Sequence, residues 1–135
     1  MIQAKKFSYK IWTDASEDMM GFATVKSGET FYCSKKITGK NLKNPIHLKE
    51  FAAVNWAAEN CPKDSHVHIF CDSLHVVSAI RRGVARNEKM HNFLKKLIKI
   101  LVRDAKILSI SWTKSEDNLA DWPSRNECKI RFIKS

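Results

Sequence analysis

The chain has 135 residues, of which 44% are hydrophobic and 28% charged, with only 4 Gly and 3 Pro. The length suits one domain spanning residues 1–135, and the composition excludes a disordered or fibrous chain. The formal net charge is +10, from 24 Lys and Arg against 14 Asp and Glu. This surplus favours a polyanionic partner, and nucleic acid is the first candidate.

Cysteine usage and hydropathy indicate the expected compartment. Cys33, Cys61, Cys71 and Cys128 form no CxxC pair and show no zinc-type spacing, so neither a metal finger nor a disulfide framework is predicted. The N-terminus lacks the apolar segment of a signal peptide, and no stretch approaches the roughly 18 apolar residues of a membrane span. We expect an intracellular protein, cytoplasmic or nuclear, that is neither secreted nor membrane-bound.

Three strands are predicted in the first part of the chain. Residues 7–14 alternate between apolar and polar side chains, and Asp14 ends that segment. Residues 20–26 and 30–36 flank a short Ser-Gly-Glu segment, in which Gly28 supplies the positive φ that a tight turn requires. These two segments therefore predict a hairpin.

Helical spacing of apolar residues starts at residue 46, after the turn-rich residues 38–45. In the clearest helix, residues 89–103, an apolar stripe that runs from Met90 to Val102 is expected to pack on the sheet. The tail from Cys128 to Ser135 is ambiguous between an edge strand and a loose basic end. The other predicted elements are a helix at 46–60, a strand at 66–72, a helix at 74–82 closed by Gly83, a strand at 107–112 and a helix at 118–125.

The order of these elements, β-β-β-α-β-α-α-β-α, predicts a mixed α/β sheet. Consecutive strands can be joined by hairpins, whereas the later parallel strands need helical crossovers. We therefore expect five strands, three antiparallel and then parallel ones, flanked by helices.

Four acidic residues occupy unusual positions. Asp14 and Asp72 each end an apolar strand, Glu50 lies on the apolar helix 46–60, and Asp121 stands between Ala and Trp in the last helix. Taken singly, each fits an N-cap, a turn or a solvated helix surface. Brought together, they would repel one another unless cations lie among them, so a pair of Mg²⁺ or Mn²⁺ ions is predicted.

Several segments resemble the ribonuclease H domain attached to the reverse transcriptases of retroelements. The resemblance covers about residues 12–125 and leaves 126–135 as a tail. The segments that carry it are Thr13-Asp14-Ala15-Ser16, Gly21-Phe22-Ala23, His47-Leu48-Lys49-Glu50-Phe51-Ala52-Ala53, Ile69-Phe70-Cys71-Asp72-Ser73, and the closing Asn118-Leu119-Ala120-Asp121-Trp122-Pro123-Ser124-Arg125. The last segment is the most specific, because it matches the N-x-x-A-D-x-x-S-R ending of tyrosine-recombinase retrotransposons.

The resemblance implies a ribonuclease H-like fold and a catalytic, metal-binding set of Asp14, Glu50, Asp72 and Asp121. It implies two Mg²⁺ ions, for which Mn²⁺ can substitute, and hydrolysis of the RNA strand of RNA–DNA hybrids to leave 5′-phosphate and 3′-hydroxyl ends. It also implies a partner reverse transcriptase domain or a larger polyprotein.

Other positions are matched more loosely. Ser16 and Glu17 stand where family members contact the RNA backbone, and the basic run containing Arg81, Arg82 and Arg86 is a candidate seat for DNA phosphates, with a solvated helix end as the alternative. Many members carry a histidine about ten residues before the last aspartate, where this chain has Ser111 or Trp112. None of the five histidines occupies that position, and each is interpreted as structural or exposed. The four tryptophans are interpreted as core residues.

Two alternatives to the hybrid nuclease stay open. One is a catalytically silent nucleic-acid-binding or assembly domain, against which the intact set of four acids argues. The other is a nuclease of the same fold with a different nucleic-acid substrate, because fold alone does not specify the reaction.

Overall fold

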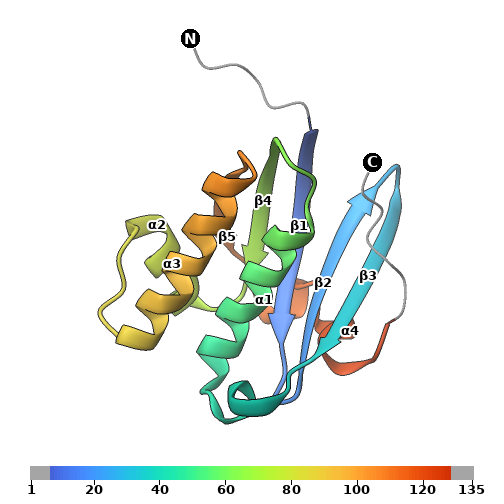
Figure 1. Cartoon of the computed structure of the whole chain (residues 1–135). Coiled ribbons are helices and arrows are strands. Elements are labelled where there is room, and N and C mark those ends of the chain that lie inside the picture. The colour runs from blue at the N-terminus through green and yellow to red at the C-terminus, as the bar shows by residue number, and fades with distance from the viewer. Residues whose placement is uncertain (1–6, 129–135) are drawn as a thin grey trace.

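The computed structural model describes residues 7–128, which form a five-stranded sheet with helices on both faces (Figure 1). The strand order is β3-β2-β1-β4-β5. β1 pairs antiparallel with β2 and β2 with β3, whereas β4 is parallel to both β1 and β5. The predicted mixed sheet is therefore confirmed. The strands are β1 (Phe7–Ala15), β2 (Met19–Lys26), β3 (Glu29–Lys36), β4 (Ser65–Cys71) and β5 (Ile107–Trp112).

The helices begin and end close to the predicted residues. Gly83, which closes the second helix, has a φ of 71°, the left-handed conformation expected of a C-terminal glycine. The predicted helix at 118–125 is shorter than expected, because a 3-10 turn at Ser115–Asp117 precedes it and it starts at Asp121. The helices are α1 (Ile46–Asn60), α2 (Leu74–Arg82), α3 (Glu88–Arg103) and α4 (Asp121–Arg125), and a further 3-10 turn spans Gly39–Lys43.

The main core lies between the sheet and α1. Alternate residues of β4 are buried, and Phe22 of β2 packs against Trp56 of α1 with ring centroids 4.7 Å apart. Burial of these apolar side chains is the principal source of folding free energy. The largest fully buried aliphatic side chains of this core are Ile11, Leu48, Val54, Val67, Ile69, Val76 and Leu97.

The position of α3 corrects one expectation. This helix packs chiefly on α1, where Phe93 stacks on Phe51 at 5.9 Å, and not on the sheet. Val102 is consequently 77% exposed, although it belongs to the predicted apolar stripe. The pattern identified an amphipathic helix but not its partner.

The opposite face of the sheet carries α4, which contacts β1, β2 and β3. A Cβ atom on Gly21 would lie only 2.4 Å from the backbone nitrogen of Ser124. Glycine at this position therefore permits the backbone of α4 to lie directly against β2. No helix within residues 7–128 is long and apolar enough to cross a membrane, and no disulfide joins the four cysteines. Residues 129–135, on which the edge-strand alternative depends, lie outside the described part of the chain.

Candidate metal site and basic cavity

The parallel pairing of β1 and β4 brings two of the predicted acids to the same edge of the sheet. Thr13 is the register partner of Cys71, so the next residues, Asp14 and Asp72, lie side by side. The carboxyl ends of neighbouring parallel strands meet at one edge, and that edge is the usual location of functional groups in open α/β sheets. Sheet register therefore explains this proximity.

Glu50 joins these two acids from the second turn of α1. One of its carboxylate oxygens, an Asp72 carboxylate oxygen and the Cys71 sulfur all lie within 4.8 Å of one another. The Ser73 side chain, at the N-cap of α2, hydrogen-bonds to Glu50. Helix α1 therefore places Glu50 at the same edge of the sheet as Asp14 and Asp72.

The protonation of Asp14 and Glu50 reflects this crowding. Burial raises the pKa of Asp14 to about 6, and repulsion by Asp72 and Asp121 adds to the effect. Burial also raises the pKa of Glu50 to about 7, together with repulsion by Asp72 and Asp14. Both groups are therefore held in a place where negative charge is unfavourable without a nearby cation.

Asp121 occupies the rim of the cluster. It lies close enough to Asp14 to raise the pKa of that carboxyl, yet its own side chain is 52% exposed. Arg125, one turn further along α4, donates from Nε to Asp121 Oδ1 at 3.0 Å. The structure thus brings Asp14, Glu50 and Asp72 together and places Asp121 beside them, paired with an arginine.

A set of hydrogen bonds fixes α4 and hence Asp121. Asn118 donates from Nδ2 to the carbonyl of Thr13 at 3.0 Å, and its Oδ1 accepts from the amide of Ala120. The hydroxyl of Ser124 lies 3.1 Å from Asp14 Oδ2 and 2.9 Å from the Asp121 carbonyl. Asn118 and Ser124 are buried, so these contacts anchor the segment to β1.

Ser16 has a structural contact of its own. Its hydroxyl donates to the Ser124 carbonyl at 2.6 Å and so helps to hold α4. Glu17 is exposed, and its backbone carbonyl accepts a hydrogen bond from the buried Lys49. The predicted contact of Ser16 and Glu17 with RNA stays a prediction.

The basic run, which starts in the last turn of α2 and continues beyond it, borders a cavity of about 900 Å³. Arg82 and Arg86 line it together with His47 and His75, whose ring centroids are 5.7 Å apart. Arg81 points elsewhere and donates from Nε to the Ile110 carbonyl at 3.1 Å. The cavity adjoins the acid cluster, because His47 precedes Glu50 by one helical turn and His75 follows Asp72 by three residues.

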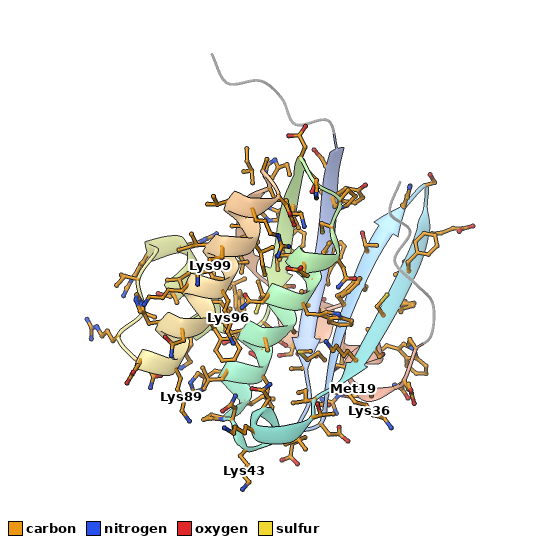
Figure 2. All side chains as sticks on the ribbon, viewed as in Figure 1. Met19, Lys36, Lys43, Lys89, Lys96 and Lys99 are labelled. Atoms are coloured by element: carbon orange, nitrogen blue, oxygen red, sulfur yellow. The ribbon has the colours of Figure 1, made fainter. Side chains whose placement is uncertain are left out.

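Further positive charge lies on α3 and on the turn before α1. Figure 2 shows Lys89, Lys96 and Lys99 along α3, and Lys43 at the turn before α1. Such a surface attracts polyanions over a distance of about 10 Å at 0.1 M salt.

The sequence analysis assigned no role in the site to three residues that the structure places in or beside it. His47 could have been found from its spacing of one helical turn before Glu50, and Ser124 from its place in the closing motif. Cys71 gave no signal, because a cysteine that ends a buried strand is usually only a core residue. Two tryptophans correct the core interpretation: Trp112 is 46% exposed, with its Nε1 donating to the Asp72 carbonyl, and Trp122 is 58% exposed.

The fold was compared with known proteins. No family model and no curated protein matches the sequence. Among solved structures, ribonuclease H1 from the halophilic archaeon Halobacterium salinarum aligns with a TM-score of 0.67 and 16% identity, covering 84% of this chain and 92% of that one. LC11 ribonuclease H1, isolated from compost by a metagenomic approach and solved in complex with an RNA/DNA hybrid, aligns with a TM-score of 0.67 and 20% identity over 84% of this chain and 91% of that one.

A third similar structure is the N-terminal ribonuclease H domain of a Mycobacterium tuberculosis protein, with a TM-score of 0.61 and 10% identity over 86% of this chain and 89% of that one. The five-stranded mixed sheet expected from the order of elements matches the two ribonuclease H1 structures. At these identities the likeness establishes architecture alone. The chain therefore has the ribonuclease H-like fold.

Proposed function

We propose that this chain is a single-domain, metal-dependent endonuclease that hydrolyses the RNA strand of RNA–DNA hybrids. The observation that carries the proposal is the meeting of Asp14, Glu50 and Asp72, with Asp121 at the rim, on one edge of a ribonuclease H-like sheet. Four acids from four separate segments have no structural reason to gather there.

The donor set fits hard divalent cations. Carboxylate oxygens are the preferred ligands of Mg²⁺ and Mn²⁺, and the burial and mutual repulsion that raise the pKa values of Asp14 and Glu50 favour a bound cation. Asp14, Glu50, Asp72 and Asp121 would hold two Mg²⁺ ions, which when bound supply a nucleophilic water and stabilise the leaving oxygen of a phosphodiester. The expected products carry 5′-phosphate and 3′-hydroxyl ends.

The protein groups have distinct tasks in this proposal. Asp14 is held by Ser124 on the buried side, so its carboxylate has a fixed direction. Asp121 must exchange its Arg125 contact for a metal, which its exposure permits. Arg82 and Arg86 would bind phosphates of the complementary strand in the cavity beside the cluster. A phosphate contact by Arg81, which donates to the Ile110 carbonyl and does not line this cavity, stays a prediction from the sequence.

The hybrid is the favoured substrate for two reasons. The structure of LC11 ribonuclease H1 contains an RNA/DNA hybrid, and the present chain has the same fold. Its formal charge of +10 suits a duplex recognised through phosphates and 2′-hydroxyls, with little sequence preference. An origin in a retroelement and association with a reverse transcriptase stay predictions from the sequence.

The experiment is cleavage of an end-labelled RNA–DNA hybrid in Mg²⁺, with EDTA as the metal-free control. Asp72→Asn should lower the rate by roughly 100-fold or more, the scale of losing one group that stabilises charge in the transition state. Asp117→Asn is the matched control, because Asp117 lies exposed in the 3-10 turn beyond β5. Failure of the parent chain to cut any hybrid in Mg²⁺ or Mn²⁺ would reject the nuclease.

Two further measurements distinguish the hybrid nuclease from a nuclease with another substrate and from a catalytically silent binding domain. Double-stranded RNA and branched DNA are offered in place of the hybrid, and preferential cutting of either would reject the hybrid as substrate. Hybrid binding without metal-dependent cutting, unchanged in Asp72→Asn, would instead identify a catalytically silent binding domain.

A further inference from the structure

The acid cluster contains a thiol. Cys71 is the last residue of β4, and its Sγ atom, a Glu50 carboxylate oxygen and an Asp72 carboxylate oxygen lie within 4.8 Å of one another. These three donors differ in chemical character, because carboxylate oxygens are hard ligands and a thiolate is a soft one. The chain therefore offers a mixed ligand set inside a site otherwise suited to Mg²⁺.

The buried sulfur has two polar neighbours that can donate to it, the Ser73 backbone and the Thr13 side chain. Thr13 is the register partner of both Cys71 and Phe22, so these side chains point to the face of the sheet that α1 covers, and Thr13 and Cys71 are each 1% exposed. Among residues 7–128, the Thr13 hydroxyl makes no hydrogen bond of normal geometry, and its interaction is with the Cys71 sulfur. A buried hydroxyl without a strong acceptor is unfavourable, and a negatively charged sulfur accepts a hydrogen bond more strongly than the neutral thiol does.

We propose that Glu50, Cys71 and Asp72 form a binding site for a thiophilic divalent ion such as Zn²⁺ or Cd²⁺, and that such an ion excludes Mg²⁺ from the acid cluster. The thiol releases its proton to solvent when the metal–sulfur bond forms, so two carboxylates and one thiolate surround the cation. Water completes a four-coordinate site.

The geometry requires only a small adjustment. Ligand atoms of a tetrahedral Zn²⁺ site lie about 3.5 Å apart, given bonds of roughly 2.0 to 2.3 Å. The three donors, within 4.8 Å of one another, need a shift of about 1 Å to meet this spacing. Glu50 and Asp72 are partly exposed and can move, whereas the buried sulfur stays fixed.

The test measures metal binding directly, without nucleic acid. The full chain carrying Cys128→Ser, which removes a partly exposed thiol, is titrated with Cd²⁺ alone. Binding is followed by calorimetry and by thiolate-to-metal charge-transfer absorption in the ultraviolet. Cys71→Ser should abolish the absorption and weaken Cd²⁺ binding by about 10- to 100-fold, the scale seen even for residues that merely support a metal ligand.

Cys61→Ser is the matched control. Cys61 is a buried cysteine whose Sγ hydrogen-bonds to the Ala57 carbonyl, and serine can replace that bond. It should leave both Cd²⁺ readouts unchanged. Added Mg²⁺ should lower the apparent Cd²⁺ affinity of the parent chain, because both ions need Glu50 and Asp72.

Three results would overturn the proposal: unchanged Cd²⁺ affinity in Cys71→Ser, charge-transfer absorption that survives this substitution, or an apparent Cd²⁺ affinity that Mg²⁺ does not change. Should Cys71→Ser fail to fold, Glu50→Gln keeps the thiol and must still weaken Cd²⁺ binding; no change there also rejects the site. This site uses two acids of the proposed nuclease site, but its test does not depend on nuclease activity. A chain that cannot cut a hybrid can still bind Cd²⁺ through Cys71. A chain that cuts a hybrid can also fail to bind Cd²⁺ in this way.

Discussion

Glu50→Gln is expected to stabilise the metal-free protein at pH 8, although it removes a proposed metal ligand. Burial and the carboxylates of Asp72 and Asp14 raise the pKa of Glu50 from 4.5 to about 7 in the folded chain. In the unfolded chain the group ionises at its ordinary pKa. Folding therefore becomes less favourable as the pH rises, because the folded state holds the proton more tightly.

The pH window and the magnitude follow from these two pKa values. Below pH 4.5 both states are protonated and the substitution has little effect on unfolding free energy. The penalty develops between pH 4.5 and 7 and is complete above pH 7. The difference between these two pKa values corresponds to roughly 3 kcal/mol after a small allowance for solvent screening of the partly exposed carboxylate, and the neutral glutamine avoids this penalty at every pH.

Urea denaturation in EDTA at pH 4, 6 and 8 measures this effect. The difference in unfolding free energy between Glu50→Gln and the parent should grow from near zero to roughly 3 kcal/mol across the series. Glu116→Gln, at an exposed position in the 3-10 turn before α4, should show no such growth. Added Mg²⁺ should stabilise the parent more than Glu50→Gln, because a ligand stabilises the state that binds it.

The reasoning would be refuted by a gain that is equal at all three pH values, or by a loss of stability at pH 8. The first outcome would mean that packing or hydrogen bonding dominates the substitution. The second would mean that the ionised carboxylate is compensated within the folded chain and that no cation is needed.

The remaining predictions concern the elements that hold and border the site. Gly21→Ala should destabilise the protein by about 2 to 3 kcal/mol, because its methyl group would lie 2.4 Å from the backbone of α4; a thermal melt measures this, and an unchanged melting temperature would contradict the packing described. Lys106→Met should cost about 1 to 3 kcal/mol, because it removes the 2.8 Å donor of the buried Ala58 carbonyl, while Asp104 keeps its contact with Arg103; urea denaturation checks it, and a neutral effect would show that the Lys106 ammonium contributes nothing. Arg82→Glu and Arg86→Glu should each weaken hybrid binding and lower the slope of log affinity against log salt by at least about 1, as measured by fluorescence anisotropy; an unchanged slope would place the phosphates elsewhere.

The sequence alone determined the elements and their order. Apolar periodicity is local information, so helices such as α1 and turns such as the one at Gly28 follow from residues within one or two turns of each other. The acids could also be singled out individually, because a carboxylate at the end of an apolar strand is unusual wherever the strand lies.

The sequence did not determine which elements pack against one another. An apolar stripe reports that a helix has a buried face but not what buries it, and α3 packs on α1 while Val102 stays in solvent. Likewise the indole of Trp112 is half exposed because β5 ends beside Asp72, although tryptophan is usually buried.

Only the tertiary structure decided which groups share the site. The parallel register of β1 and β4 sets Asp14 beside Asp72 and Thr13 beside Cys71, and this pairing joins residues almost 60 positions apart. Ser124 reaches Asp14 only because Gly21 lets α4 lie against the sheet. The physical reason is that electrostatic and coordination energies depend on distances in space, which the linear order of residues does not contain.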